Sequence, residues 1–161
     1  YVVHDWSTAS HTTVRSLCGV DCARLDLTGV TASVIGHLSS TVVRCEVRAV
    51  NVVDVWFCHS AGADWPKVAS MLDECDPRLA GPGLWLISRL LPDVVPDSVV
   101  DRQVARLSTA ARHKLDSIDA SATLRDSSSR TTLAWRQAFT TRPRERVAVL
   151  RQMGRSVRVH R

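Results

Sequence analysis

The stretch TVVRCEVRAVNVVDVWFC, residues 41–58, decides the fold class. From residue 43 to 50, apolar odd positions alternate with the charged residues Arg44, Glu46 and Arg48. This alternation and the β-branched residues favour a half-buried strand, and residues 52–57 form a second apolar run that suits another strand. The same stretch also matches helical spacing through Val43, Val47, Val50 and Phe57. The choice between strand and helix is open here; we favour strand because the three charged residues share one strand face.

The segment before this stretch supplies the rest of a compact unit. Residues 23–27 alternate like a strand, and residues 30–39 carry apolar side chains at helical spacing. Together with residues 43–57 they predict a β-α-β-like unit with a parallel sheet. The expected fold class is therefore α/β or α+β, with a helical C-terminal half and a basic tail. An all-α helical repeat is the alternative.

Helices are expected on both sides of this unit. Residues 7–18 suit a helix that Gly19 stops, and residues 64–75 suit one capped by Asp64 with Pro66 in its first turn. Gly81-Pro82-Gly83 reads as a turn before a helix over 84–91. The strongest helical pattern then runs without interruption through Val100, Val104, Leu107, Ala111, Leu115 and Ile118.

These patterns divide the chain into four segments. Residues 1–62 hold the β-α-β-like unit, and residues 63–118 form a helical segment that packs on it. Residues 119–130 are a polar linker that contains three consecutive serines, and residues 131–161 carry short helices and an Arg-rich arm.

Charge is segregated along the chain. Residues 1–141 carry 14 basic and 15 acidic side chains, whereas residues 142–161 carry seven arginines against Glu145 alone. The expected anion-binding residues are Arg142, Arg144, Arg146, Arg151, Arg155, Arg158 and Arg161. Guanidinium groups bind phosphate in a bidentate fork, so RNA phosphate, anionic lipid or an acidic protein surface would suit this arm.

The composition and the cysteines indicate the class of protein and its surroundings. The longest charge-free run, residues 27–43, is too polar for a membrane span, so no transmembrane segment is expected. Five cysteines at irregular spacing argue against a disulfide framework or a zinc site and favour buried thiols. We therefore expect a reducing compartment such as the mitochondrial matrix side; whether a presequence was removed stays open.

No motif for catalysis or cofactor binding stands out. The chain lacks a P-loop, a dinucleotide fingerprint, a nucleophile elbow and an H-E-x-x-H pair, so no cofactor, metal or catalytic residue is expected. Asp26, His59 and Asp64 are the candidates for a scattered acid–base site, with Ser60 in the same loop. The acidic cluster Asp73, Glu74 and Asp76 suits a solvated helix end better than a metal site.

Tryptophans are unusually frequent, with five in a chain that has one tyrosine and two phenylalanines. Trp56 and Trp85 sit in apolar runs and are expected in the core. Trp135 is expected to anchor the terminal helix to the body, with stacking on a nucleic-acid base as the alternative.

The expected function is therefore that of a non-enzymatic structural subunit of a large assembly. An organellar (mitochondrial) ribosomal or other ribonucleoprotein subunit fits best, with neighbouring subunits and rRNA as partners. The alternatives are an accessory subunit of a mitochondrial respiratory or ATP-synthase complex, with the arm near anionic lipid, and a small α/β enzyme with a non-motif site.

Overall fold

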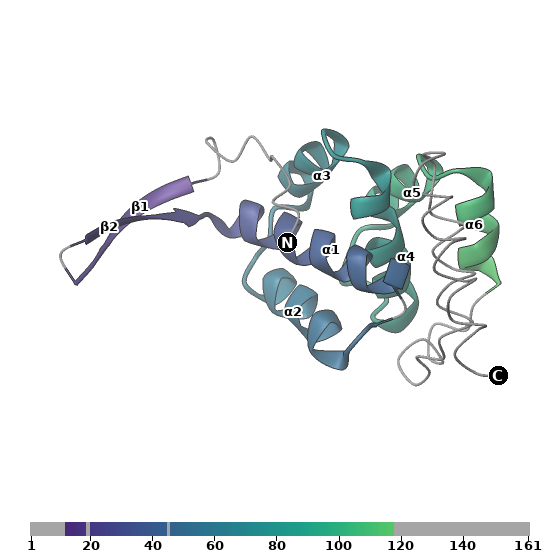
Figure 1. Cartoon of the computed structure of the whole chain (residues 1–161), viewed down its shortest axis with the longest axis horizontal. Coiled ribbons are helices and arrows are strands. Elements are labelled where there is room, and N and C mark those ends of the chain that lie inside the picture. Colours follow the sequence, from purple (N-terminus) through teal and green to yellow (C-terminus); the bar gives the residue numbers. More distant parts are fainter. Residues whose placement is uncertain (1–11, 19, 45, 118–161) are drawn as a thin grey trace, which may run out of the picture.

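The computed structural model describes residues 12–18, 20–44 and 46–117, which form a helical body and one β-hairpin (Figure 1). The body consists of six α-helices and a short 3₁₀ turn. In chain order the elements are β1 (Thr12–Leu17), β2 (Val20–Leu25), α1 (Leu27–Arg44), α2 (Ala49–Ser60), α3 (Trp65–Asp73), the 3₁₀ turn η2 (Pro77–Leu79), α4 (Gly81–Leu90), α5 (Asp97–Ala105) and α6 (Thr109–Asp116). The architecture is mostly helical and compatible with the α+β class. None of the described helices combines the length and apolarity needed to cross a bilayer.

The sheet is an antiparallel pair, so the predicted β-α-β unit with a parallel sheet is wrong. Leu17 pairs with Val20 and Thr12 pairs with Leu25, which leaves a two-residue connection. Cys18 in that connection has φ 52°, the left-handed conformation that tight hairpin loops require. The helix predicted over residues 7–18 is therefore wrong for residues 12–17, and residues 7–11 lie outside the described part.

The helix predicted over residues 30–39 is confirmed, and it extends in both directions to form α1. Asp26 begins it by accepting a hydrogen bond from the Gly29 N–H on Oδ1 (2.7 Å). This helix is the centre of the body because it packs against α2, α3 and α4. Two of its buried hydroxyls bind locally, since Thr31 donates to the Leu27 carbonyl (2.6 Å) and Thr41 to the Leu38 carbonyl (2.7 Å).

Both strands predicted between residues 43 and 57 are wrong. Helix α1 continues to Arg44, Val47 is buried in the connection, and α2 begins at Ala49. The β-branched residues favoured a strand, but in the described part of the chain no strand pairs with this stretch. Packing of Val52, Val55 and Cys58 against the rest of the body overrides the local preference.

The predicted α3 and α4 are confirmed with adjusted bounds. Asp64 caps α3 as expected, accepting the Lys67 N–H on Oδ1 (3.2 Å). The turn predicted at Gly81-Pro82-Gly83 is instead the buried first turn of α4. Proline is tolerated there because the first-turn N–H groups have no intrahelical partner.

The uninterrupted helix predicted from residue 97 to 118 is wrong, because two helices meet at a break over residues 106–108. Ser108 caps α6 by accepting the Ala111 N–H (3.3 Å), and this cap competes with continuation of α5. The predicted apolar face is nevertheless the buried one, with Val100, Leu107, Ala111 and Leu115 in the core. Ile118 lies outside the described residues.

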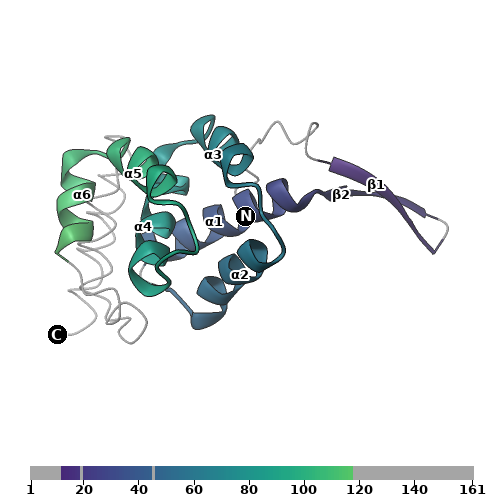
Figure 2. The same cartoon turned by 180° about the vertical axis from the view of Figure 1, so that it is seen from behind.

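The two segments predicted at residues 1–62 and 63–118 share one hydrophobic core, as far as their residues are described. Its fully buried members include Ile35 and Leu38 from α1, Leu72 from α3 and Leu84 from α4. The hairpin lies outside this core and projects away from the helices in both views (Figures 1 and 2). The linker 119–130 and the segment 131–161 are outside the described residues.

Candidate functional site

The expected anion-binding arginines, residues 142–161, lie outside the described part of the chain, so their prediction stands on sequence alone. The charge of the described body can be compared with the charge of this arm. Between residues 12 and 117 the sequence holds 11 basic and 12 acidic side chains. The described body is therefore nearly neutral, and the excess of positive charge lies in residues 142–161.

Several acidic groups in the body are occupied by nearby arginines. Asp73 accepts the amide of the fully buried Gln103 on Oδ1 (2.7 Å) and forms ion pairs with Arg102 and Arg106. Arg78 donates a hydrogen bond from Nε to Asp76 Oδ2 (2.9 Å). Two members of the predicted acidic cluster, Asp73 and Asp76, are therefore paired with guanidinium groups, and no group of three potential metal ligands occurs among the described residues.

Arg106 has a structural role in this network. Its Nη1 donates to the Leu72 carbonyl (3.1 Å), and its Nη2 donates to the carbonyls of Asp73 (2.8 Å) and Cys75 (3.0 Å). The Leu72 and Asp73 carbonyls lie in the last turn of α3, and the Cys75 carbonyl lies just beyond it. The Leu72 carbonyl also accepts the Cys75 N–H (3.1 Å), so Arg106 adds a second donor there. One side chain from the end of α5 thus closes the C-terminal end of α3.

The candidate acid–base residues also have structural partners. Trp65 Nε1 donates to His59 Nδ1 (3.4 Å), and Asp26 begins α1. Asp64 Oδ2 lies 2.8 Å from Lys67 Nζ, and the hydrogen bonds from Lys67 lower the pKa of the Asp64 carboxyl. Each group has a place in helix capping or loop packing that accounts for it.

Two surface hollows contain polar side chains. The first, about 200 Å³, lies between α1 and α2 and is lined by Ser33, Val34, His37, Asn51 and Asp54. Ser33 and His37 are four residues apart on α1 and share one face with Asp54 opposite. No hydrogen bond or ion pair joins these three side chains in the described structure. A volume of about 200 Å³ is also below the roughly 300–1,000 Å³ of typical ligand sites.

The second hollow is larger, about 400 Å³, and lies at the junction of η2, α5 and α6. Asp76, Arg78, Arg106 and Ser108 supply its polar groups. Arg78 is paired with Asp76, Arg106 binds the end of α3, and Ser108 caps α6. These polar groups therefore have partners at the start of η2, at the start of α6 and at the end of α3.

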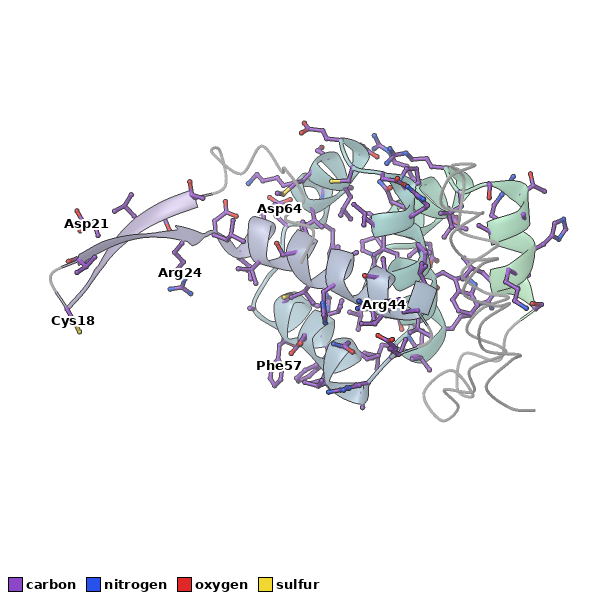
Figure 3. All side chains as sticks on the ribbon, in the orientation of Figure 1. Cys18, Asp21, Arg24, Arg44, Phe57 and Asp64 are labelled. Carbon is purple, nitrogen blue, oxygen red and sulfur yellow. The ribbon has the colours of Figure 1, made fainter. Side chains whose placement is uncertain are left out.

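Three of the five cysteine side chains are described, and they take three different environments; Cys45 and the side chain of Cys22 lie outside the described part. Cys58 is buried, as expected, but Cys18 is exposed at the tip of the hairpin (Figure 3), which contradicts the expectation for that residue. Cys75 is partly buried, and burial raises the pKa of its thiol. All three are free thiols.

The outer face of α2 is the feature that the sequence reasoning missed. Trp85 is buried as predicted, but Trp56 is 45% exposed and the prediction of a core position is wrong. Val50, Val53 and Phe57 are 42–59% exposed beside it, and Phe57 points away from the body (Figure 3). The available signal was that α2 carries apolar residues on both sides, with Asp54 as its only formal charge at pH 7.

Comparisons with known proteins give no assignment. No family model matches the chain, and neither a curated protein nor a solved structure is significantly similar to it.

Proposed function

We propose that this protein is a non-enzymatic structural subunit of a large assembly, most simply a mitochondrial ribosomal or other ribonucleoprotein subunit. In this proposal its Arg-rich C-terminus lies on RNA phosphate. The observation that carries the proposal is the segregation of charge: seven arginines against one glutamate in residues 142–161, after a body of nearly balanced charge. Such an arm repels itself and is stabilised by a polyanion.

The described body supports a structural role in two ways. Several of its polar side chains have structural partners: Asp73 and Arg106 connect α3 with α5, and Asp64 caps α3. Its surface offers a projecting hairpin and an apolar helix face, which suit contacts with neighbouring subunits. The free thiols of Cys18, Cys58 and Cys75 suit a reducing compartment such as the mitochondrial matrix.

The test is RNA binding by the full chain and by two triple variants of equal charge change. In the first variant the arm residues Arg151, Arg155 and Arg158 become Gln. In the matched control the body residues Arg48, Arg89 and Arg112 become Gln; all three are exposed and form no ion pair in the described structure. Both variants lose three positive charges, so a difference between them reports the location of the charge.

Binding is measured as the dissociation constant for single-stranded RNA over a range of salt concentrations. The full chain should show a slope of log K against log salt of about −3 to −4, as expected for about 4–6 neutralised phosphates of a single strand. The arm variant should reduce the magnitude of that slope by about 2, and the body variant should leave it nearly unchanged. Equal slopes for the two variants would contradict a role of the arm.

The second candidate is an accessory subunit of a respiratory or ATP-synthase complex, with the arm near anionic lipid or a subunit interface. The exposed Trp56 and Phe57 favour it, because such side chains also suit an interface with other subunits or lipid. Sedimentation of the endogenous protein separates the two candidates. Release from its particle by nuclease supports the RNA assignment, whereas retention on membranes after nuclease treatment supports this one.

A further inference from the structure

The outer face of α2 forms a continuous apolar surface. Val50, Val53 and Phe57 recur at spacings of three and four residues, and Trp56 lies beside Phe57 with the two rings in edge-to-face contact (5.2 Å between centroids). The opposite side of the helix buries Asn51, Val52, Val55 and Cys58 in the body. A helix that is apolar on both sides is normally covered on both sides.

We propose that this face, defined as Ala49, Val50, Val53, Trp56 and Phe57, is the contact surface of a symmetric homodimer. The second copy places its own α2 antiparallel on the first. This inference concerns self-association and does not rest on the proposed RNA-binding role.

The sequence of the face is complementary to itself in size. When two copies of α2 run antiparallel about a two-fold axis at Val53, each Val53 meets the Val53 of the other copy. Counting three residues outward in each direction places Val50 opposite Trp56 of the other copy. Ala49 then lies opposite Phe57, so each large ring meets a small side chain, which allows close packing across a helix pair.

The charges agree with the same arrangement. The face itself carries no charged residue, so pairing it with a copy of itself brings no like charges together. Arg48, exposed at the start of α2 and free of ion pairs in the described structure, comes opposite the C-terminal end of the other α2. The carbonyl groups at a helix C-terminus carry partial negative charge and favour a nearby cation.

The size of the face indicates a weak dimer. Trp56 and Phe57 are 45% and 59% exposed, and with the valines they offer on the order of 400 Å² per copy. Two such faces bury less than the roughly 1,200 Å² of standard interfaces, so the dissociation constant should be on the order of micromolar or weaker. We infer a second copy as the occupant because each large ring meets a small side chain of the other copy and because the face carries no charge that would repel its own copy.

Sedimentation equilibrium of the full chain tests the proposal. The mass should rise from 17.7 kDa toward twice that value as concentration increases. The concentrations should run from about 1 to about 300 µM, to bracket a micromolar constant. A chain that stays monomeric over this range overturns the proposal.

Two aspartate variants localise the contact. Val53→Asp places two carboxylates against each other at the axis and should weaken the dimer by at least about tenfold. Val14→Asp is the matched control, because Val14 is an equally apolar residue that is 71% exposed on the hairpin, and it should leave association unchanged. A dimer that survives Val53→Asp, or that both variants weaken equally, contradicts this surface.

Disulfide crosslinking tests the same contact between copies and does not require the aspartate variant to fold. In a Cys18→Ser background, Val53→Cys should form an intermolecular disulfide under mild oxidation much faster than Val14→Cys or the background alone. This follows because only position 53 meets its own copy at the axis. Equal rates for the two cysteine variants would overturn the antiparallel arrangement.

Discussion

At the residue scale, Ser39 and Gly83 hold the two most closely packed helices together. The Ser39 hydroxyl donates to the Ala80 carbonyl (3.0 Å) and accepts the Gly83 N–H (2.9 Å), and its side chain is fully buried. A Cβ on residue 83 would lie 2.6 Å from Ser39 Oγ and 2.9 Å from Ser39 N. Only glycine therefore allows α4 to approach α1 at this point.

We expect Gly83→Ala to destabilise the protein by about 1–3 kcal/mol, because the clash involves backbone atoms of α1 that cannot move aside. Ser39→Ala should cost about 1–3 kcal/mol, because it leaves a buried carbonyl and N–H without their partner. Urea unfolding of both variants and of the double variant measures these costs. The double variant should lose less than the sum, because removing Oγ relieves part of the clash; strict additivity would contradict this contact.

At the element scale, the described helices α1, α3 and α6 begin at local caps, whereas the end of α3 is bound by a side chain that is distant in sequence. Arg106 at the end of α5 supplies hydrogen bonds to three carbonyls of the chain around the end of α3. Arg102, one turn earlier, forms only a surface ion pair with the same Asp73 and is 60% exposed. Both arginines thus form an ion pair with Asp73, but only Arg106 also binds backbone carbonyls at the end of α3.

This difference predicts unequal effects of the same substitution. Arg106→Gln should lower the free energy of unfolding by about 1–3 kcal/mol, since it removes charge-assisted hydrogen bonds to three backbone carbonyls, of which the bond to Leu72 is partly buried. Arg102→Gln should change it by less than about 1 kcal/mol, as for exposed ion pairs. Thermal and urea unfolding of the two variants provide the comparison. Similar losses of stability would mean that Arg106 stabilises the protein mainly through its ion pair with Asp73 and not through its hydrogen bonds to the carbonyls.

At the scale of the whole molecule, stability is distributed unevenly between the body and the hairpin. The body has a continuous core from Ala32 to Leu115, whereas β1 makes its main contacts with β2 and Val14 and Val20 are largely exposed. An isolated two-stranded hairpin is at best marginally stable in water.

Hydrogen exchange should therefore separate the two regions. Amides of residues 12–25 should show protection factors below about 100, whereas those around Ile35 and Leu38 should exchange only through global unfolding. Mass spectrometry of peptides from the two regions measures this difference. Protection of the hairpin comparable to that of α1 would show that another surface covers it in solution.

The sequence alone determined features that depend on neighbouring residues. The Asp64 cap with Pro66, the apolar spacing of residues 30–39 and the stop of α4 before Pro92 all rest on local hydrogen bonding and helical periodicity. The unequal distribution of charge is likewise a property of the sequence. This charge distribution points to residues 142–161 as the candidate anion-binding site. That assignment stays a prediction, because these residues lie outside the described part.

Only the tertiary structure decided the form of residues 41–58 and the surface of α2. A strand needs a hydrogen-bonded partner along its edge, and within the described part only residues 12–17 and 20–25 pair in this way. Burial of Val52 and Val55 against the body then made the helix the more stable choice, and the same packing left Trp56 and Phe57 facing outward. Residues 41–58 satisfy both periodicities, so the free energy of packing with distant residues, which no local pattern contains, determined the result.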